Sequence, residues 1–195
     1  MKIRYNAPVI LTLTFLSAAV LITDTLTGLH LTEAFFAAAP KGYFNPVNPV
    51  SYFRLFSHII GHANWEHLLS NFTIILLIGP ILEEKYRSGR LLFMILVTAL
   101  VTGILNLLFF NTALLGASGI AFMMIILVSI TNYRKGEIPL TFILVVLLFL
   151  AKEVIMITAA DNISQTAHIV GGVCGSLFGF NHGKKNDVSE DPVYP

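Results

Sequence analysis

The amino-acid sequence predicts an all-α membrane protein, built as a bundle of six transmembrane helices. Hydrophobic residues make up 55% of the 195 positions, charged residues make up 12%, and the mean hydropathy is +0.78. Apolar runs of about 20 residues, the length that crosses a bilayer core of about 30 Å, recur along the chain. The net charge of +1 provides no broad basic surface. Nucleic acid is therefore not expected as a partner.

Polar breaks divide the apolar runs into six predicted spans. They cover residues 8–29, 64–82, 89–110, 116–132, 138–158 and 163–180. Nine basic residues then fall on one side of the membrane: Lys2, Arg4, Lys85, Arg87, Arg90, Arg134, Lys135, Lys184 and Lys185. Only Lys41 and Arg54 fall on the other side. Because cytoplasmic loops carry the excess of Lys and Arg, both termini are predicted to be cytoplasmic.

Residues 1–183 are predicted to form one core, with an external loop at about 30–63 and a polar, disordered cytoplasmic tail at 184–195. We find no internal repeat and no second domain. The first span has a basic start and a small-residue "SAA" stretch, so a cleaved signal peptide is an alternative that its uninterrupted length disfavours. Cys174 is the only cysteine, so no intrachain disulfide forms.

Four of the six histidines lie in or near predicted helices, three of them in "HIIGHANWEHLLSN". Asn64 is a suitable N-cap for a helix that starts here, and His67 and Asn71 then share one face of it. Unpaired polar groups in a membrane helix cost several kcal/mol, so they normally face a bundle interior or a wet cavity. These residues indicate a site, with interhelical hydrogen bonding as the alternative for His67 and Asn71 and loop hydrogen bonding for His58 and His62.

A zinc site is a competing interpretation, because His58 and His62 have the i, i+4 spacing of metal ligands. However, the sequence contains no HExxH motif, and residues 62–67 are one residue too long for the reversed H-x-x-E-H motif. No carboxylate lies in an apolar span as an obvious third ligand beside them. A metalloprotease is therefore disfavoured.

Nucleophilic catalysis accounts better for the polar residues. A serine hydroxyl is a weak nucleophile until a base takes its proton, and His168 is the only histidine within a later span. Ser118, near the start of the fourth span, and His168, near the start of the sixth, are predicted at similar depths below the outer surface. An ordinary small-residue helix contact is the alternative for Ser118 taken alone.

Glycines predict that these two spans approach closely. Gly116 and Gly119 lie beside the serine, while Gly171 and Gly175 form a small-x-x-x-small face after His168. Backbones without side chains can come near enough for a hydroxyl–imidazole hydrogen bond. His67 and Asn71 can reach the same layer and donate N–H groups to an oxyanion.

The ordered set "FRLFSHIIGHANWEHLLSN", "GASG" and "AHIVGGVCG" resembles the rhomboid intramembrane serine proteases, on the expected second, fourth and sixth spans. The resemblance implies a six-helix rhomboid-like bundle in which Ser118 is the nucleophile and His168 its base, without an aspartate or a cofactor. It implies that His67 and Asn71 build the oxyanion hole with the Ser118 backbone N–H, and that His62 and Arg54 support the external loop. Phe53 stands where the family often has Trp, which affects no catalytic role.

The resemblance implies single-pass membrane proteins as substrates, cleaved in or near the bilayer, and a bacterial plasma membrane as the expected location. A helical peptide bond is shielded and hydrogen-bonded, so it must unwind before a serine attacks. The alternative is a catalytically inactive rhomboid-like protein that binds membrane helices; such relatives usually lack the Ser and His present here. A transporter is disfavoured because paired broken half-helices are missing.

Lys152 and Glu153 in the fifth span lie outside the motifs. Adjacent helical residues point about 100° apart, so the two are poorly placed to pair with each other. The simple interpretation is that Lys152 extends toward the surface and Glu153 meets a polar partner or water. Since the fifth span borders the substrate entry in rhomboids, the alternative is that Glu153 forms part of a gate.

Overall fold

The computed structural model describes residues 3–130, 137–156 and 162–188, with the side chains of residues 3–130, 137–148 and 166–181. All regular structure in these ranges is helical, apart from one isolated antiparallel bridge between Ala38 and Leu114. The helices are α1 (Pro8–Thr27), α2 (Leu31–Phe35), α3 (Pro49–Ser57), α4 (Trp65–Tyr86), α5 (Ser88–Phe109), α6 (Ser118–Ser129), α7 (Leu140–Met156) and α8 (Asn162–Val188). The prediction of an all-α protein is confirmed.

Three helices in the described part of the chain are long and apolar enough to cross a membrane: α1 with 20 residues, and α4 and α5 with 22 residues each. The apolar α6 has only 12 residues. At 1.5 Å per residue it extends about 18 Å, less than the thickness of a bilayer core. Helix α6 is therefore too short to cross such a core by itself.

The six predicted spans match α1, α4, α5, α6, α7 and α8 to within a few residues, except at the end of α8. There the helix continues to Val188. The predicted disorder of the 184–195 tail is therefore wrong for residues 184–188; residues 189–195 lie outside the described part.

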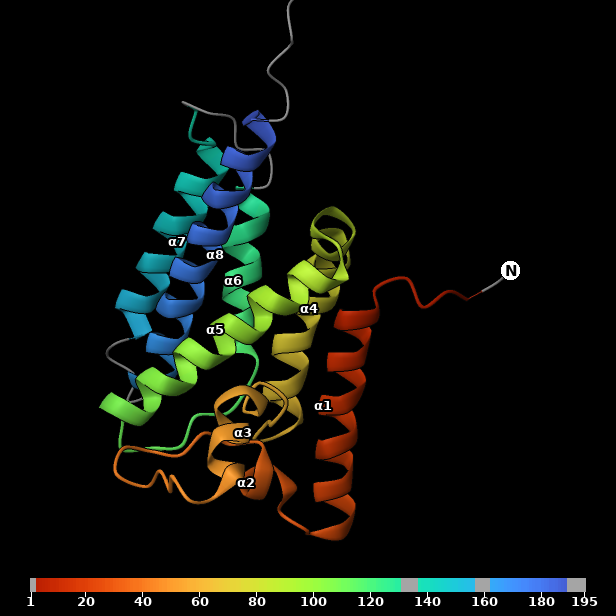
Figure 1. Cartoon of the computed structure of the whole chain (residues 1–195), viewed down its shortest axis with the longest axis vertical. Coiled ribbons are helices and arrows are strands. Elements are labelled where there is room, and N and C mark those ends of the chain that lie inside the picture. The colour runs from red at the N-terminus through yellow and green to blue at the C-terminus, as the bar shows by residue number, and fades with distance from the viewer. Residues whose placement is uncertain (1–2, 131–136, 157–161, 189–195) are drawn as a thin grey trace, which may run out of the picture.

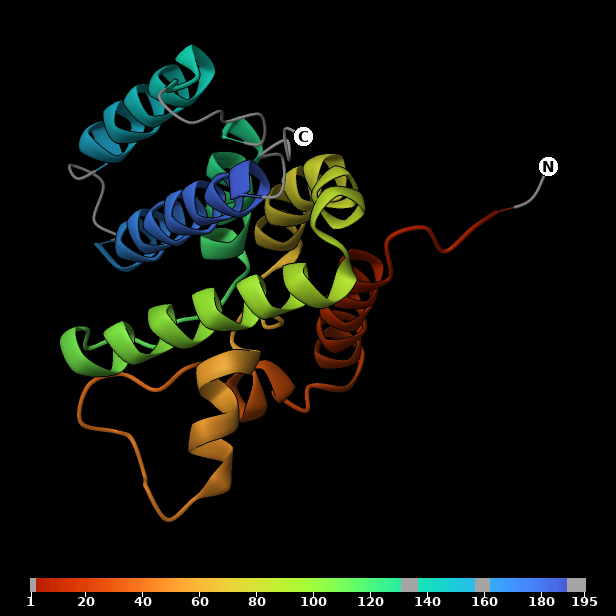
Figure 2. The same cartoon turned by 45° about the horizontal axis from the view of Figure 1, so that its top comes forward.

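Helix α6 lies at the centre of the bundle and contacts α4, α5, α7 and α8 (Figures 1 and 2). Residues 119–124 of this helix are all buried. Helix α1 stands at one edge beside α4, and α7 lies at the opposite edge of the bundle. The short helices α2 and α3 fold the predicted external loop, and α3 packs on α5. The centre of the bundle is thus the start of a short, fully surrounded helix.

Side-chain caps hold α2 in place at both ends. The Asp24 carboxylate, near the end of α1, accepts hydrogen bonds from the backbone N–H groups of Leu31 (2.6 Å) and Thr32 (2.8 Å). Arg54 of α3 donates from Nε to the Ala34 carbonyl at 2.9 Å. These charge-assisted bonds satisfy N–H and C=O groups that a five-residue helix leaves free at its ends.

Glu83 links the end of α4 to the beginning of α1. Its side chain is buried, with 4% exposed, and its two oxygens accept hydrogen bonds from the backbone N–H groups of Val9 (3.0 Å) and Ile10 (3.1 Å). These N–H groups have no partner within their own helix, and the positive end of the α1 dipole favours the carboxylate. Glu83 thus fixes the first turn of α1 against α4.

We expect Glu83→Ala to lower the free energy of unfolding by about 2 to 3 kcal/mol, because two buried N–H groups lose an ionised acceptor. Glu84→Ala, at the exposed neighbouring position, is the matched control and should change stability little. The measurement is the unfolding midpoint of each purified variant in detergent. Equal midpoints for the two variants would show that the Glu83 cap contributes no stability.

Candidate functional site

The beginning of α4 presents two of the predicted site residues. Asn64 is the N-cap of this helix, and its side-chain oxygen accepts the backbone N–H of His67 at 2.8 Å. The cap fixes where the helix starts, so His67 and Asn71, four residues apart, lie on one face as predicted. Asn71 is buried, with 6% exposed, and its Nδ2 atom has no acceptor among the described residues. A free amide donor therefore lies inside the bundle.

The loop before α6, residues 110–117, packs against this face of α4 at Gly116. Gly116 has φ +110°, which residues with a Cβ atom rarely adopt. A Cβ atom at Gly116 would also lie 2.5 Å from His67 Cε1 and 3.6 Å from Asn71 Nδ2. Glycine is therefore required here for two reasons. Gly116 comes two residues before Ser118 in the sequence, so His67 and Asn71 lie beside the loop that leads to the serine.

His58 and His62 hold the same loop from the other side. The backbone carbonyl of His58 accepts the N–H of Gly116 at 2.9 Å, and its imidazole Nε2 lies 3.0 Å from the Ala99 carbonyl of α5. His62 Nδ1 lies 3.0 Å from the Ile60 carbonyl, while its Nε2 accepts the N–H of Ala117 over 3.4 Å. The predicted hydrogen bond to loop backbone is confirmed for His62, which also accepts the N–H of the residue before the serine. For His58 the prediction is wrong, because its imidazole bonds a carbonyl of helix α5.

Burial keeps both loop histidines neutral. Desolvation lowers the pKa of His58 from 6.5 to about 4, and the hydrogen bond to Ala99 offsets only part of this effect. Desolvation likewise lowers the pKa of His62 to about 4, opposed by the hydrogen bond to Ile60 and assisted by the charge of His67. A neutral His62 with its proton on Nδ1 has Nε2 free to accept the Ala117 N–H.

Ser118 is the first residue of α6, and no side chain caps this end of the helix. The first backbone hydrogen bond in this turn runs from the N–H of Ala121 to the carbonyl of Ala117. The N–H groups at the first positions of a helix have no partner within the helix, and the helix dipole places partial positive charge there. Ser118 therefore lies where the backbone favours a negatively charged oxygen.

Helices α6 and α8 approach so closely that backbone meets backbone. A Cβ atom at Gly119 would lie 3.1 Å from the Ala167 carbonyl oxygen. A Cβ atom at Gly171 would overlap the carbonyl of Gly119, and one at Gly175 would overlap the carbonyl of Met123. The predicted close approach of the two helices is confirmed at Gly119, Gly171 and Gly175, whereas Gly116 lies against α4 instead.

This contact brings the neighbours of Ser118 and His168 together. Gly119 follows the serine, and Ala167 precedes the histidine. The imidazole of His168 packs on the ring of Phe122, one turn after Ser118, with the ring centroids 4.2 Å apart. The serine and the histidine thus lie on adjacent turns of two touching helices.

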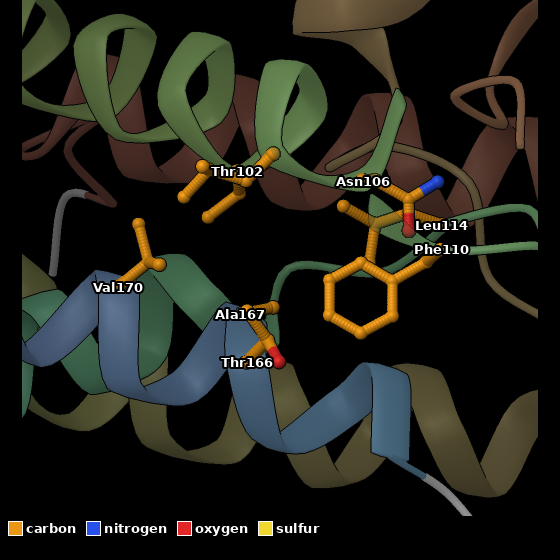
Figure 3. A pocket seen from close by; sticks show the side chains of 8 residues that line it. Thr102, Asn106, Phe110, Leu114, Thr166, Ala167 and Val170 are labelled. Atoms are coloured by element: carbon orange, nitrogen blue, oxygen red, sulfur yellow. The ribbon is translucent and has the colours of Figure 1, made fainter. Parts of the chain in front are cut away.

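A small cavity lies between α5 and the first turns of α8 (Figure 3). Its volume is about 10 Å³, and its walls include Asn106, Phe110 and Ala167. That volume is near the lower limit for one water molecule. The Asn106 side chain also donates from Nδ2 to the carbonyls of Ala39 and Thr112, so it ties the external loop to the loop before α6.

The structure gathers most of the predicted site residues at the start of α6. Arg54 lies apart from them on α3, where it caps α2. Lys152 and Glu153 fall in a part of α7 whose side chains lie outside the described residues. Sequence reasoning missed Phe122, although its position four residues after Ser118 on a helix is a usable signal. It also missed Glu83, whose place in the last turn opposes the dipole of its own helix.

Apolar helices around a cluster of buried and half-buried Ser, His and Asn residues define an integral membrane protein with a polar site inside the bundle. The chain belongs to the rhomboid family, because residues 49–185 match the Rhomboid domain. It is also similar to the "Rhomboid protease GlpG" of Haemophilus influenzae, with 26% identity over 130 residues that cover 65% of this chain and 68% of that protein. The family is one of intramembrane proteases.

We expect the stability of the protein to fall as the pH drops from about 6.5 to about 4. In this window an unfolded His58 binds a proton that the folded protein, with the pKa of His58 near 4, does not bind. The loss is on the order of 3 kcal/mol for one histidine. Unfolding in detergent, measured against pH, should show a flatter dependence for His58→Gln, whose amide can still donate to Ala99 but does not titrate. An unchanged slope would argue against this origin.

Proposed function

We propose that this protein is an intramembrane serine endopeptidase that uses Ser118 as nucleophile and His168 as general base. The contact between Gly119 and the Ala167 carbonyl carries the proposal, because it fixes the residue after the serine against the residue before the histidine. Phe122 supports the imidazole from one side. In the reaction, His168 takes the hydroxyl proton as Ser118 attacks the peptide carbonyl, and returns it to the leaving amine. Water then hydrolyses the acyl-enzyme, and the dyad needs no cofactor.

The oxyanion of the tetrahedral intermediate would form at the uncapped beginning of α6. The Ser118 backbone N–H, the Asn71 amide and the His67 imidazole are the proposed donors. Asn71 Nδ2 is buried without an acceptor, and a donor that is already desolvated and positioned needs no reorganisation during the reaction. The helix dipole adds positive potential at the same point. His62 would act as a positioning residue, because its Nε2 accepts the N–H of the residue before the nucleophile.

The proposed substrates are single-pass membrane proteins that enter the bundle from the bilayer. A transmembrane helix hides its peptide bonds in backbone hydrogen bonds, so segments that unwind easily would be cleaved preferentially. Because α6 is short, Ser118 would lie below the membrane surface. We further propose that residues 1–183 form a six-span core with Glu153 at a gate, and that residues 184–195 are a cytoplasmic tail.

The distribution of Lys and Arg supports cytoplasmic termini in a bacterial plasma membrane. We expect a single cysteine placed at the exposed Gly42, in a Cys174→Ala background, to be labelled by an impermeant reagent from outside intact cells. A tag after Pro195 should be accessible only after the cells are permeabilised. Labelling of both positions from the same side would contradict six spans.

We expect a fluorophosphonate probe to label Ser118, because a hydroxyl activated by an imidazole reacts where an ordinary serine does not. Ser118→Ala and His168→Ala should prevent labelling and reduce cleavage of a transmembrane substrate by more than about 1000-fold. Ser129→Ala, at the other end of α6, and Cys174→Ala are the matched controls and should label like wild type. The adduct is mapped by mass spectrometry. A probe on another serine, or cleavage by Ser118→Ala, would show that Ser118 is not the nucleophile and that "GASG" is only a packing motif. A wild type that neither labels nor cleaves would favour the inactive helix-binding alternative.

We expect Asn71→Ala and His67→Ala each to lower kcat by roughly 100-fold to 1000-fold, the usual loss for one oxyanion donor. Thr73→Ala is the control on the same helix, because that exposed hydroxyl only donates to the carbonyl of Leu69. Turnover and detergent unfolding midpoints are measured together. Lower midpoints at an unchanged kcat would assign Asn71 and His67 to interhelical hydrogen bonding instead.

A further inference from the structure

An apolar groove of about 490 Å³ lies between α1, α3 and α5. Leu13 and Leu16 of α1, Phe56 of α3, and Leu92, Ile95 and Leu96 of α5 supply much of its lining. Helices α1 and α3, which supply part of its lining, lie on the side of the bundle away from α7 (Figure 2). None of the residues proposed for catalysis lines it.

Exposed basic residues lie next in sequence to the lining at one end of the groove, which is called its basic end below. Its lining begins at Pro8 and Ser88, the first residues of α1 and α5. Arg87 directly precedes Ser88 and is exposed. Arg4, also exposed, precedes Tyr5, and the Tyr5 hydroxyl lies 2.9 Å from Oγ1 of Thr12, which lines the groove.

The acidic residues near this end leave its basic character in place. Both oxygens of Glu83 accept hydrogen bonds from the start of α1, and its side chain is buried. Glu84 is exposed and is adjacent in sequence to Lys85. The basic end also lies on the side of the bundle where the loops carry most of the Lys and Arg residues.

We infer that this groove binds an anionic phospholipid, with the phosphate at Arg87 and the acyl chains along α1 and α5. An apolar groove with an exposed arginine directly before one of its lining residues complements a molecule with two hydrocarbon chains and a negative headgroup. Basic pockets between membrane helices on the cytoplasmic side bind such headgroups. A zwitterionic lipid offers the same chains without the net charge.

The bound lipid would stabilise the segment that holds the site. Phe56, Ser57, Ile59 and Ile60 line the far end of the groove, and they bracket His58. The His58 carbonyl accepts the N–H of Gly116, and its imidazole binds the Ala99 carbonyl. Acyl chains packed on residues 56–60 would therefore reduce local opening of this segment. This inference does not depend on the proposed protease activity.

The test is native mass spectrometry of the purified, delipidated full chain in detergent, titrated with dioleoyl phosphatidylglycerol or with dioleoyl phosphatidylcholine. We expect tighter binding of phosphatidylglycerol, and we expect Arg87→Gln to weaken it about fivefold, the effect of one basic residue near an anionic lipid. Arg90→Gln removes the same charge three residues further along the chain, at a position of α5 that does not line the groove, and should have little effect. Hydrogen exchange should slow at residues 56–60 when phosphatidylglycerol is added.

A second pair of variants tests the acyl-chain wall. Leu92→Trp fills the groove and should reduce binding of phosphatidylglycerol, whereas Leu108→Trp, at a similarly exposed position of α5 outside the groove, should not. Equal affinity for the two lipids, or equal loss in both arginine variants, would overturn the inference. A dimer of this chain that phosphatidylglycerol does not dissociate, or unchanged hydrogen exchange at residues 56–60, would also overturn it.

Discussion

The backbone contact between α6 and α8 is the constraint on which the rest of the structure depends. Lipid tails are as apolar as leucine, so packing rather than the hydrophobic effect holds membrane helices together. Here the packing partners are carbonyl groups, and a side chain at Gly171 or Gly175 would overlap them. Because Ser118 and His168 lie next to the same contact, the spacing that allows α6 and α8 to pack also sets the distance between the proposed nucleophile and its base.

The loop before α6 depends on three histidines that act in different ways. The His58 carbonyl accepts the Gly116 N–H, and the His62 imidazole accepts the Ala117 N–H. The His67 ring packs directly on Gly116, where a Cβ atom would overlap it. These contacts satisfy the Gly116 and Ala117 N–H groups but leave the uncapped start of α6 and the Asn71 amide open. Buried donors without partners are rare and call for an explanation. The oxyanion of the proposed reaction would provide one.

The outer helices stabilise this centre from a distance. Glu83 fixes the start of α1 against α4, while Asp24 and Arg54 hold α2 between α1 and α3. Helix α3 in turn packs so closely on α5 that a Cβ atom at Gly103 would lie 2.7 Å from the Leu55 carbonyl oxygen. His58 directly follows α3 and accepts the N–H of Gly116, so the position of α3 helps to fix the loop before α6.

The sequence by itself determined the helical class, the approximate helix boundaries and the shared face of His67 and Asn71, because apolar run length and the i, i+4 repeat are local properties of the chain. It also predicted that the fourth and sixth spans approach closely at their glycines, since small residues mark close helix contacts. Only the tertiary structure decided that Phe122 lies against His168, that Glu83 caps a different helix, and that His62 accepts the Ala117 N–H. These contacts join residues of different helices or loops, or depend on how a helix is rotated against its neighbour. No local pattern encodes that rotation, because it results from the packing of all the helices at once.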